Sequence, residues 1–207
     1  MQAGFWVLEG IDGCGKSTQA KHLCQTLEGA GRRPLHLREP GSTALGEGLR
    51  RLLLEPGRSD WDPRAEALVF FAARRELLIK EIRPALAAGR DVVCERFTGS
   101  TYAYQGQASE AEAAWVLELD RLVVGDNQPH LHLILDLNPE ESFARVGREA
   151  PKDAFETRGV AFQQKVREAY LRFAKEKGSA AAVLEVGGRS IEDIAQEVVA
   201  AVEKTRP

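Results

Sequence analysis

A glycine-rich segment close to the N-terminus has the composition of a phosphate-binding loop. Its residues are Glu9-Gly10-Ile11-Asp12-Gly13-Cys14-Gly15-Lys16-Ser17-Thr18, which satisfy the spacing G-x-x-x-x-G-K-[ST]. Glycines permit the backbone angles that turn successive N–H groups toward one centre, and the N-terminus of a following helix adds partial positive charge there. Lys16 can reach the β- and γ-phosphates of a nucleotide, and the Ser17 hydroxyl can hold a magnesium ion. Since an apolar strand precedes this segment and a helical pattern follows it, the spacing predicts a nucleoside triphosphate site rather than a chance glycine-rich turn.

Three later segments carry side chains suited to a second substrate. Arg38-Glu39-Pro40-Gly41 follows a short apolar strand, which is where a doubly wound sheet places ligands. Phe70 and Arg74 are four residues apart, so they share one face of a helix. Such a pair can stack on a base and hydrogen-bond its edge, although core packing with a surface arginine fits the same spacing. Glu95-Arg96-Phe97 closes another strand and leads into Thr101-Tyr102-Ala103-Tyr104-Gln105-Gly106.

The elements that must position these residues alternate between strands and helices. Strands are expected at 5–9, 35–37, 91–94, 131–135 and 181–186. Helices are expected at about 16–27, 45–54, 63–88, 109–124, 139–146, 157–177 and 191–203, with Pro84 kinking or dividing the longest one. Asp136 is expected to cap the helix that starts at Pro139 rather than to bind magnesium. Strands joined by helical crossovers predict an α/β fold, a three-layer α/β/α sandwich around a five-stranded parallel sheet.

Length and composition exclude several classes of protein. The chain has 207 residues, 43% hydrophobic and 29% charged, which fits a single domain (1–207) with a sizeable core. A net charge of −3 disfavours a bulk nucleic-acid binder, so no nucleic-acid partner is expected. Apolar runs too short to span a bilayer, and an N-terminus without a basic region or cleavage signature, predict a cytoplasmic protein with no membrane partner. The three cysteines form no CxxC pair and no zinc-like spacing, so free thiols are expected.

Taken together, these motifs resemble the thymidylate kinase family of nucleoside monophosphate kinases. The family pattern is E-G-[ILP]-[DE]-G-x-G-K-[ST]-T, then R-E-P-G-G-T, then F-x-A-x-R, then D-R-[YFH]-x-x-S-[ST]-x-A-Y-Q-G. The matching segments run from Glu9 to Thr18, from Arg38 to Thr43, from Phe70 to Arg74 and from Glu95 to Gly106. The Tyr-Gln pair after the strand-end arginine is the most discriminating part. The resemblance implies a P-loop NTPase fold, phosphorylation of dTMP to dTDP by ATP with Mg²⁺, and a homodimer.

The resemblance also implies binding and catalytic roles. The ATP side would consist of Gly10, Ile11, Asp12, Gly13, Cys14, Gly15, Lys16, Ser17, Thr18 and Arg145, the last beside the adenine. The dTMP side would consist of Asp12, Glu39, Arg50, Phe70, Arg74, Arg96, Thr101, Tyr104 and Gln105. The catalytic set would be Asp12, Lys16, Arg96 and Arg148, and the magnesium site would use Ser17 and Glu95.

At the sugar and phosphate end of dTMP, the family implies four roles. Asp12 would accept the 3′-hydroxyl of deoxyribose, and Glu39 would line the monophosphate end of the site. Arg50 and Arg96 would bind the acceptor phosphate.

At the base end, four side chains have implied roles, and a fifth lies against the sugar. Phe70 would stack on thymine and Arg74 would bond its O4 edge, while Thr101 and Gln105 would recognise the base. Tyr104 would wall off the 2′ side of the sugar, which excludes a 2′-hydroxyl sterically.

The segment at about 145–158 resembles the family lid, with the usual pattern R-x-x-R…D-R-[FI]-E. Gly13 places the chain with the bacterial type, in which the lid supplies the catalytic arginine, and Arg148 resembles that residue. Ala154 stands where a lid arginine is usual. Arg148, Lys152 and Arg158 are the candidates to compensate, and lid closure is the step expected to suffer most.

Two further departures leave alternatives open. Glu95 replaces the usual Asp before Arg96, which moves a carboxylate one methylene further toward the magnesium-bound waters, and Ser42 replaces a glycine and should stiffen its loop. A kinase for another nucleotide or nucleoside, such as dUMP or deoxycytidine, is a second hypothesis. A nucleotide-sensing module that has lost catalysis is a third, suggested by Ala154 and Glu95. Against it stand the intact residues Asp12, Lys16, Ser17 and Arg96.

Overall fold

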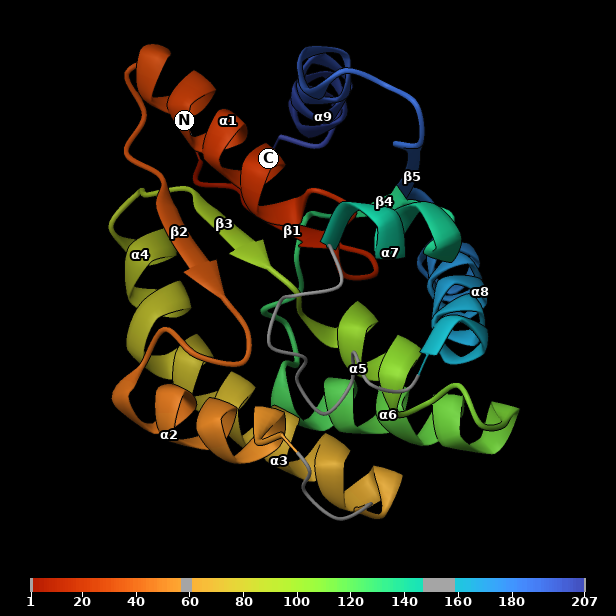
Figure 1. The fold of residues 1–207 in the computed structure, drawn as a ribbon. Helices are drawn as coiled ribbons and strands as arrows, with labels where there is room; N and C mark the ends of the chain where they lie inside the picture. Colours follow the sequence, from red (N-terminus) through yellow and green to blue (C-terminus); the bar gives the residue numbers. More distant parts are fainter. Residues whose placement is uncertain (1, 57–60, 147–158, 207) are drawn as a thin grey trace.

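The protein is built on a five-stranded parallel sheet (Figure 1). This computed structural model describes residues 2–56, 61–146 and 159–206. The strands are β1 (Phe5–Glu9), β2 (Leu35–Arg38), β3 (Val92–Glu95), β4 (Leu131–Asp136) and β5 (Ala181–Glu185). Their order in the sheet is β2-β3-β1-β4-β5, and every neighbouring pair is parallel. The expected parallel sheet is confirmed, and the strand boundaries differ from the expected ones by one residue at five of the ten ends.

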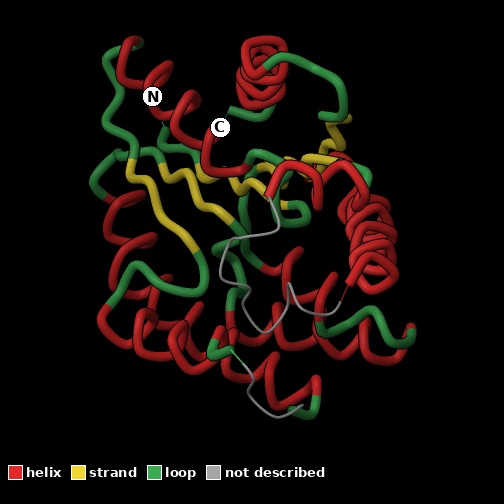
Figure 2. Tube along the Cα trace, in the orientation of Figure 1, coloured by secondary structure: helices red, strands yellow, loops and turns green. Residues whose placement is uncertain are grey.

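Helices cover both faces of the sheet and give the expected three layers (Figures 1 and 2). On one face α1 (Lys16–Gly29) packs beside α9 (Ile191–Lys204). The other face is covered by α3 (Pro63–Leu77), α4 (Arg83–Ala87), α5 (Thr98–Tyr104), α6 (Glu110–Val123) and α8 (Gly159–Lys177). Two more helices complete the fold, α2 (Ala44–Leu54) against α3, and α7 (Pro139–Val146) against α8. No helix in the described part of the chain is long and apolar enough to cross a membrane.

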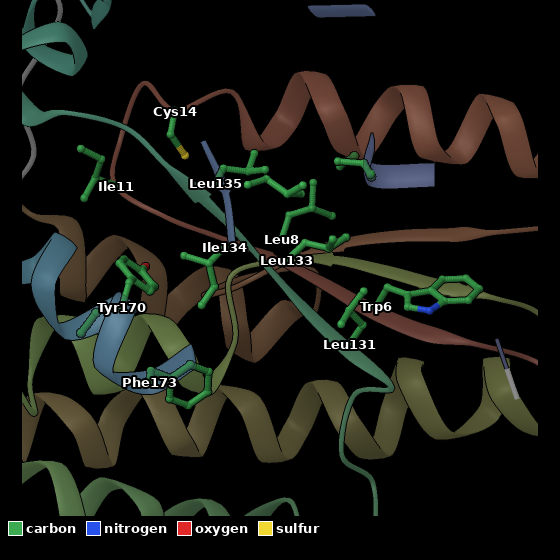
Figure 3. Close-up of a cluster of buried hydrophobic side chains, with 14 of the residues drawn as sticks. Trp6, Leu8, Ile11, Cys14, Leu131, Leu133, Ile134, Leu135, Tyr170 and Phe173 are labelled. Carbon is green, nitrogen blue, oxygen red and sulfur yellow. The ribbon is translucent and has the colours of Figure 1, made fainter. Parts of the chain in front are cut away.

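The central strands are mostly apolar, as is typical of strands with both faces buried, and their carboxylates Glu9, Glu95 and Asp136 lie at their carboxyl ends. In β1, Phe5 and Val7 belong to a cluster with the neighbouring strand β3 and with the helical residues Leu77 and Ile82. The alternate side chains Trp6 and Leu8 belong to a second cluster that includes β4, α1 and α8 (Figure 3). The sheet is therefore a rigid centre, and ligands can be held only at its ends.

The segment expected as one helix from 63 to 88 is helical throughout but interrupted. A π-helical turn, η1 (Leu78–Ile82), separates α3 from α4. Pro84 has no N–H to donate to the carbonyl four residues before it, so an α-helix cannot pass through it undisturbed. The wider turn is marked by the bond from Arg83 N to Leu78 O. Pro84 thus divides the helix, as its position predicted.

Helix α5 was not among the expected helices. It has seven residues and nearly all of them are buried, so it shows no amphipathic period that a pattern could detect. It begins three residues after β3, and Gly99 lets it approach the sheet closely. A Cβ on Gly99 would lie 2.7 Å from Oε1 of Glu9. Packing rather than periodicity therefore forms this helix, which carries several residues of the site.

The prediction that Asp136 caps α7 is wrong. The cap is Asn138, whose Oδ1 accepts a hydrogen bond from the backbone N of Glu140 at 2.9 Å. Asn138 directly precedes Pro139, the first residue of the helix, whereas Asp136 still belongs to β4. The Asp136 carboxylate instead accepts from Nε and Nη2 of Arg167 at 2.6 and 2.8 Å.

Candidate active site

The carboxyl ends of β1, β2 and β3 meet at one edge of the sheet. In the strand register Arg38 is opposite Glu95, and Glu95 is opposite Leu8. The segments that follow these strands, the phosphate loop among them, therefore begin side by side. In open parallel sheets this edge is where ligands bind.

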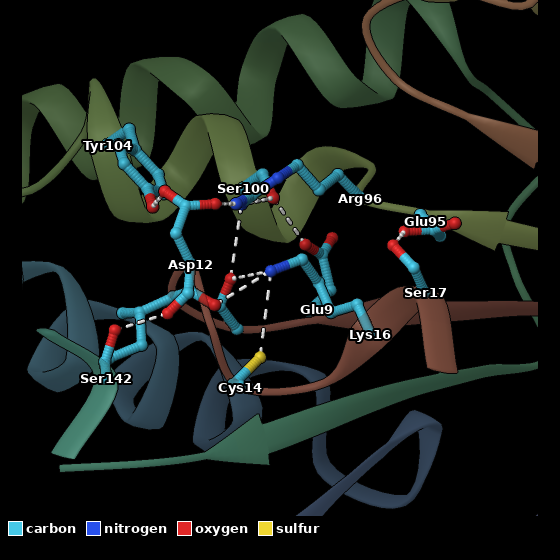
Figure 4. Close-up of polar contacts among 12 residues, drawn as sticks. Glu9, Asp12, Cys14, Lys16, Ser17, Glu95, Arg96, Ser100, Tyr104 and Ser142 are labelled. Atoms are coloured by element: carbon cyan, nitrogen blue, oxygen red, sulfur yellow. Dashed lines mark hydrogen bonds and ion pairs between the residues drawn. The ribbon is translucent and has the colours of Figure 1, made fainter. Parts of the chain in front are cut away.

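The glycine-rich segment forms a tight loop that leads directly into α1. Gly10 has φ of 135°, and a Cβ there would lie 2.5 Å from the carbonyl oxygen of Leu135, so only glycine fits. Lys16 lies inside the loop, where its Nζ donates to the carbonyl oxygens of Gly10 and Ile11 at 3.1 and 2.8 Å (Figure 4). The loop thus presents its backbone and Lys16 together, which is the arrangement that cradles a phosphate chain.

A hollow opens over this loop. It is lined by Asp12, Gly13, Gly15, Lys16, Ser17, Thr18, Arg38, Glu39, Arg50, Glu95, Arg96 and Arg145. The side chains of Ile11 and Cys14, expected on the ATP side, are buried in the core instead. These two residues can reach a nucleotide only through their backbone.

Arg145 is the one residue of the expected lid whose side chain the structure describes. Its Nη2 donates to Glu141 at 2.8 Å and to the carbonyl oxygen of Val186 at 3.2 Å, and the residue lines the hollow over the loop. The remaining lid residues, including Arg148, Lys152, Ala154 and Arg158, lie outside the described residues.

The expected magnesium ligands are in contact with each other. The Ser17 hydroxyl donates to Oε2 of Glu95, and Nε2 of His36 lies 2.9 Å from Oε1 of the same carboxylate. Burial opposes ionisation of Glu95, but the hydrogen bonds from His36 and Ser17 lower its pKa below the usual value. A hydroxyl and an ionised carboxylate beside a phosphate loop are the hard oxygen donors that Mg²⁺ takes along with phosphate oxygens and water. The donor set fits this ion.

Arg96, directly after β3, faces both the loop and the neighbouring pocket. It has φ of 65°, in the left-handed region, and its guanidinium forms an ion pair with Asp12. Its Nη1 also donates to the carbonyl oxygen of Gly10, to Ser100 Oγ and to the Tyr170 hydroxyl, each at 3.2 Å. Burial opposes ionisation of Asp12, but Arg96 and Lys16 lower its pKa below the usual value. The positive charge of Arg96 and the negative charge of Asp12 are therefore held next to each other beside the phosphate loop.

Glu9 supports this arrangement, although the expected site residues do not include it. Its carboxylate accepts from Phe97 N at 2.9 Å and from Ser100 Oγ at 2.6 Å, which ties β1 to α5. Burial raises the pKa of Glu9, and the hydrogen bond from Ser100 and the charge of Arg96 act against that rise. In the sequence, a carboxylate that directly follows the four apolar residues 5–8 of a strand is the signal that could have identified it.

A second pocket adjoins the first on the side of α3 and α5. It is lined by Asp12, Glu39, Pro40, Arg50, Leu54, Phe70, Arg74, Arg96, Phe97, Ser100, Thr101, Tyr104 and Gln105. All nine residues expected on the dTMP side are in this set. The sequence therefore predicted the grouping, although it did not predict several of the contacts that hold it together.

Arg74 is the clearest of these contacts, because it is a buried charge rather than a surface arginine. Its side chain is 1% exposed and its guanidinium lies 4.5 and 4.8 Å from the ring centres of Phe71 and Phe97. Glu39 pairs with it at 2.7 Å, and Thr101 Oγ1 accepts from its Nη2 at 3.1 Å. Burial raises the pKa of Glu39 to about 7 even though Arg74 acts to lower it. The floor of the pocket is thus buried, aromatic and held by an ion pair.

Tyr104 and Ser142 fix the position of Asp12 between the two pockets (Figure 4). The Tyr104 hydroxyl donates to Asp12 Oδ2 at 3.3 Å, and its ring lies 5.4 Å from the Arg96 guanidinium. Ser142, on α7, donates to the backbone carbonyl of Asp12. Arg50 closes the other side of the pocket, with Nη1 bonded to the carbonyl oxygen of Pro40 at 3.0 Å.

Comparisons with known proteins agree with this site. A family model described as thymidylate kinase matches residues 8–198. The thymidylate kinase of Ruegeria pomeroyi is 40% identical over 195 residues, covering 94% of this chain and 92% of that protein. That of Dinoroseobacter shibae is 42% identical over 193 residues, covering 93% and 92%. The crystal structure of thymidylate kinase from Ehrlichia chaffeensis has a TM-score of 0.78 at 30% identity, covering 98% of this chain and 100% of that one. The chain therefore belongs to the thymidylate kinase family of nucleoside monophosphate kinases.

Proposed function

We propose that the two adjoining pockets hold the two substrates of one phosphoryl transfer, from ATP to dTMP, giving ADP and dTDP. The observation that carries the proposal is their common wall. Asp12, Glu39, Arg50 and Arg96 line both the hollow over the phosphate loop and the pocket beside α3 and α5. Two ligands that fill these pockets would bring their phosphates together at that wall, as an in-line transfer requires.

On the donor side, the loop backbone, Lys16 and the N-terminus of α1 would bind the phosphates of ATP. Mg²⁺ would be held by Ser17 directly and by Glu95 through its waters, and it would neutralise charge on the phosphate oxygens. Arg96 would add positive charge at the common wall, and Arg148 of the lid would add a second cation. The phosphate oxygen of the acceptor is itself the nucleophile, so positioning and charge neutralisation supply the catalysis and no strong protein base is needed.

On the acceptor side, the aromatic and polar residues divide between base and sugar. Phe70 would stack on the thymine ring, while Arg74, Thr101 and Gln105 would face its polar edge. Asp12 would accept the 3′-hydroxyl of the sugar. Tyr104 would occupy the space that a 2′-hydroxyl needs, and Arg50 would bind the acceptor phosphate together with Arg96.

The test is ADP release from ATP and Mg²⁺ in a coupled assay, with dTMP, dUMP, dCMP, dGMP, UMP and no acceptor in parallel. We expect strong turnover with dTMP, weaker turnover with dUMP and little with UMP. Fastest turnover with another acceptor would contradict the substrate assignment. Binding of ATP and dTMP without any turnover would identify a nucleotide-sensing module instead.

We further propose that the enzyme works in the cytoplasm as a homodimer. Helix α3 packs against α2 on one side and against α6 on another, and all three helices carry large exposed apolar side chains. Leu52 is 43% exposed, Leu68 52% and Leu122 67%. Burying such a surface against a second copy is favourable by roughly 25 cal/mol per Å².

A further inference from the structure

Three buried polar atoms of residues that line the acceptor pocket have no hydrogen-bond partner among the described residues: Oε1 of Glu39, Nη1 of Arg74 and Oε1 of Gln105. Glu39 is already paired with Arg74 through its other oxygen, Oε2. Nη1 of Arg74 is a donor and Oε1 of Gln105 is an acceptor, and these two residues are 1% and 3% exposed. Leaving a buried polar group without a hydrogen-bond partner destabilises the folded protein, so such atoms are expected to find their partners in a ligand.

The donor is fixed by the surroundings of Arg74. Its Nε and Nη2 are bonded to Glu39 at 2.9 and 2.7 Å, and Nη2 also donates to Thr101 at 3.1 Å. A guanidinium carries donors only, so whatever direction Nη1 faces, it presents a donor.

The acceptor is different, because an amide side chain can present either its oxygen or its nitrogen. Gln105 Nε2 donates to Oε2 of Glu66 at 3.0 Å. Glu66 lies on α3 and is 2% exposed, so water does not compete for this bond. This bond uses the nitrogen end of the amide as its donor and leaves the oxygen end, an acceptor, for the ligand.

The resulting pair of one donor and one acceptor distinguishes two kinds of pyrimidine. Thymine and uracil carry an N–H at position 3 and a carbonyl at position 4, which complement a glutamine oxygen and an arginine N–H. Cytosine carries an acceptor at position 3 and an amino group at position 4, so both pairings would be repulsive. We propose that Glu66 is a positioning residue that determines base specificity: by orienting Gln105 it makes the pocket accept 4-oxopyrimidines and reject 4-aminopyrimidines. This proposal rests on the proposed function of the acceptor pocket.

The test is the substitution Glu66→Gln, with kcat/KM and Kd measured for dTMP and dCMP. The amide introduced by this substitution can donate as well as accept, so the amide of Gln105 is free to reverse and present its nitrogen to the base. We expect the dTMP-to-dCMP ratio of kcat/KM to fall by about tenfold to a hundredfold, the range set by one mispaired buried group. The KM of ATP should not change. A residue that acts only through stability would lower the values for both pyrimidines together and leave the ratio unchanged.

Two further variants complete the test. In the exchange Glu66→Gln with Gln105→Glu, the carboxylate faces the base and the amide lies behind it, so an acceptor is again presented and the ratio should recover. The matched control is Glu112→Gln, which removes a carboxylate on neighbouring α6 that is bonded to Arg64 outside the pocket. It should leave the ratio unchanged.

The outcomes separate the two proposals. If the unaltered chain used dCMP as well as dTMP, the proposed function and this inference would both fail. If the unaltered chain discriminated and Glu66→Gln kept the same ratio, or if the exchange did not restore a lowered one, only the role of Glu66 would be overturned.

Discussion

Arg96 is the residue on which the two pockets depend, because it is held by more partners than any ordinary surface arginine. It bonds Asp12, the Gly10 carbonyl, Ser100 and Tyr170 while adopting φ of 65°. Such a backbone conformation costs a non-glycine residue on the order of 1 kcal/mol, which the surrounding contacts must offset. The guanidinium fork spans these partners at once, whereas a lysine ammonium is a single point of charge.

We therefore predict that Arg96→Lys lowers kcat by about a hundredfold, the typical effect of losing one preorganised donor at the reacting group. The melting temperature should change little, because Ser100 and Tyr170 remain bonded to each other at 2.8 Å. Steady-state kinetics and thermal unfolding of the same preparation measure both. A kcat within threefold of the unaltered enzyme would remove Arg96 from the catalytic set.

Tyr104 yields a prediction about the sugar. Its ring is 9% exposed and packs edge-on against Tyr170 at 6.4 Å and near Phe162 at 6.1 Å, so it cannot move aside for a 2′-hydroxyl. Tyr104→Ala should raise the UMP-to-dUMP ratio of kcat/KM by about tenfold, since steric exclusion is worth about 1–3 kcal/mol. Tyr104→Phe keeps the ring and is the control. An unchanged ratio in the alanine variant would show that another residue excludes the ribose.

The sequence could predict which site residues lie together when they are close along the chain, because local backbone geometry then sets their relative positions. Lys16 and Ser17 follow from the loop spacing, and Phe70 and Arg74 from one helical turn. It could not predict partners that only the tertiary fold brings together. Glu66 meets Gln105 across 39 residues and Ser100 meets Glu9 across 91, and neither pair has a local signal.

The same contrast holds for helices and strands. Helix α6 was predicted closely because Ser109 caps it, with Oγ accepting from Glu112 N at 3.2 Å. Strands β1 and β4 were predicted because a central parallel strand has a nearly continuous run of apolar residues. Helix α5 has neither a side-chain cap nor a periodic pattern, so the sequence did not predict it. This helix nevertheless contributes Ser100, Thr101 and Tyr104 to the acceptor pocket.

The packing of β4 against α8 makes the stability of the protein depend on pH. His132 on β4 is buried edge-on against Phe173 at 5.1 Å, and burial together with the charge of Lys177 lowers its pKa to about 3. The unfolded chain, with a histidine pKa of about 6.5, binds a proton that the folded chain excludes between these two values. The free energy of unfolding therefore falls as the pH drops below about 6.5, by about 2 kcal/mol at pH 5 from this group.

Replacing His132 with Phe should remove that part of the acid sensitivity. Denaturant unfolding at about pH 7.5 and about pH 5 measures it, and the difference between the two pH values should shrink by about 2 kcal/mol. His22→Gln, at a half-buried position on α1, should leave the difference unchanged. If His132→Phe lost as much free energy of unfolding between the two pH values as the unaltered chain, another group would cause the loss of stability in acid.

At the scale of the whole molecule, the surface of α3 and α6 predicts the oligomeric state. Leu68→Glu combined with Leu122→Glu would place two charges in the middle of the proposed interface, where unpaired charge is costly to bury. We expect light scattering to give a dimer for the unaltered chain and a monomer for this variant at micromolar concentration. Val183→Glu, on edge strand β5 and 42% exposed before substitution, is the matched control and should remain a dimer. A dimeric double variant, or a monomeric unaltered chain, would contradict the proposed interface.

The sulfur atoms of the protein have a practical consequence. All three cysteines are free and buried: Cys14 in the phosphate loop, Cys24 on α1 and Cys94 on β3. Burial raises the pKa of Cys24 to about 11, and that of Cys94 also lies above its usual value, so the reactive thiolate form of these two residues is scarce in the folded state. Cys14 is 2% exposed, so a reagent in solvent hardly reaches its thiol. The natural chain is therefore a suitable background for a fluorescent probe. A single cysteine introduced on the solvent side of α6 or α9 would be the thiol that a maleimide dye labels, and no native cysteine would need to be removed first.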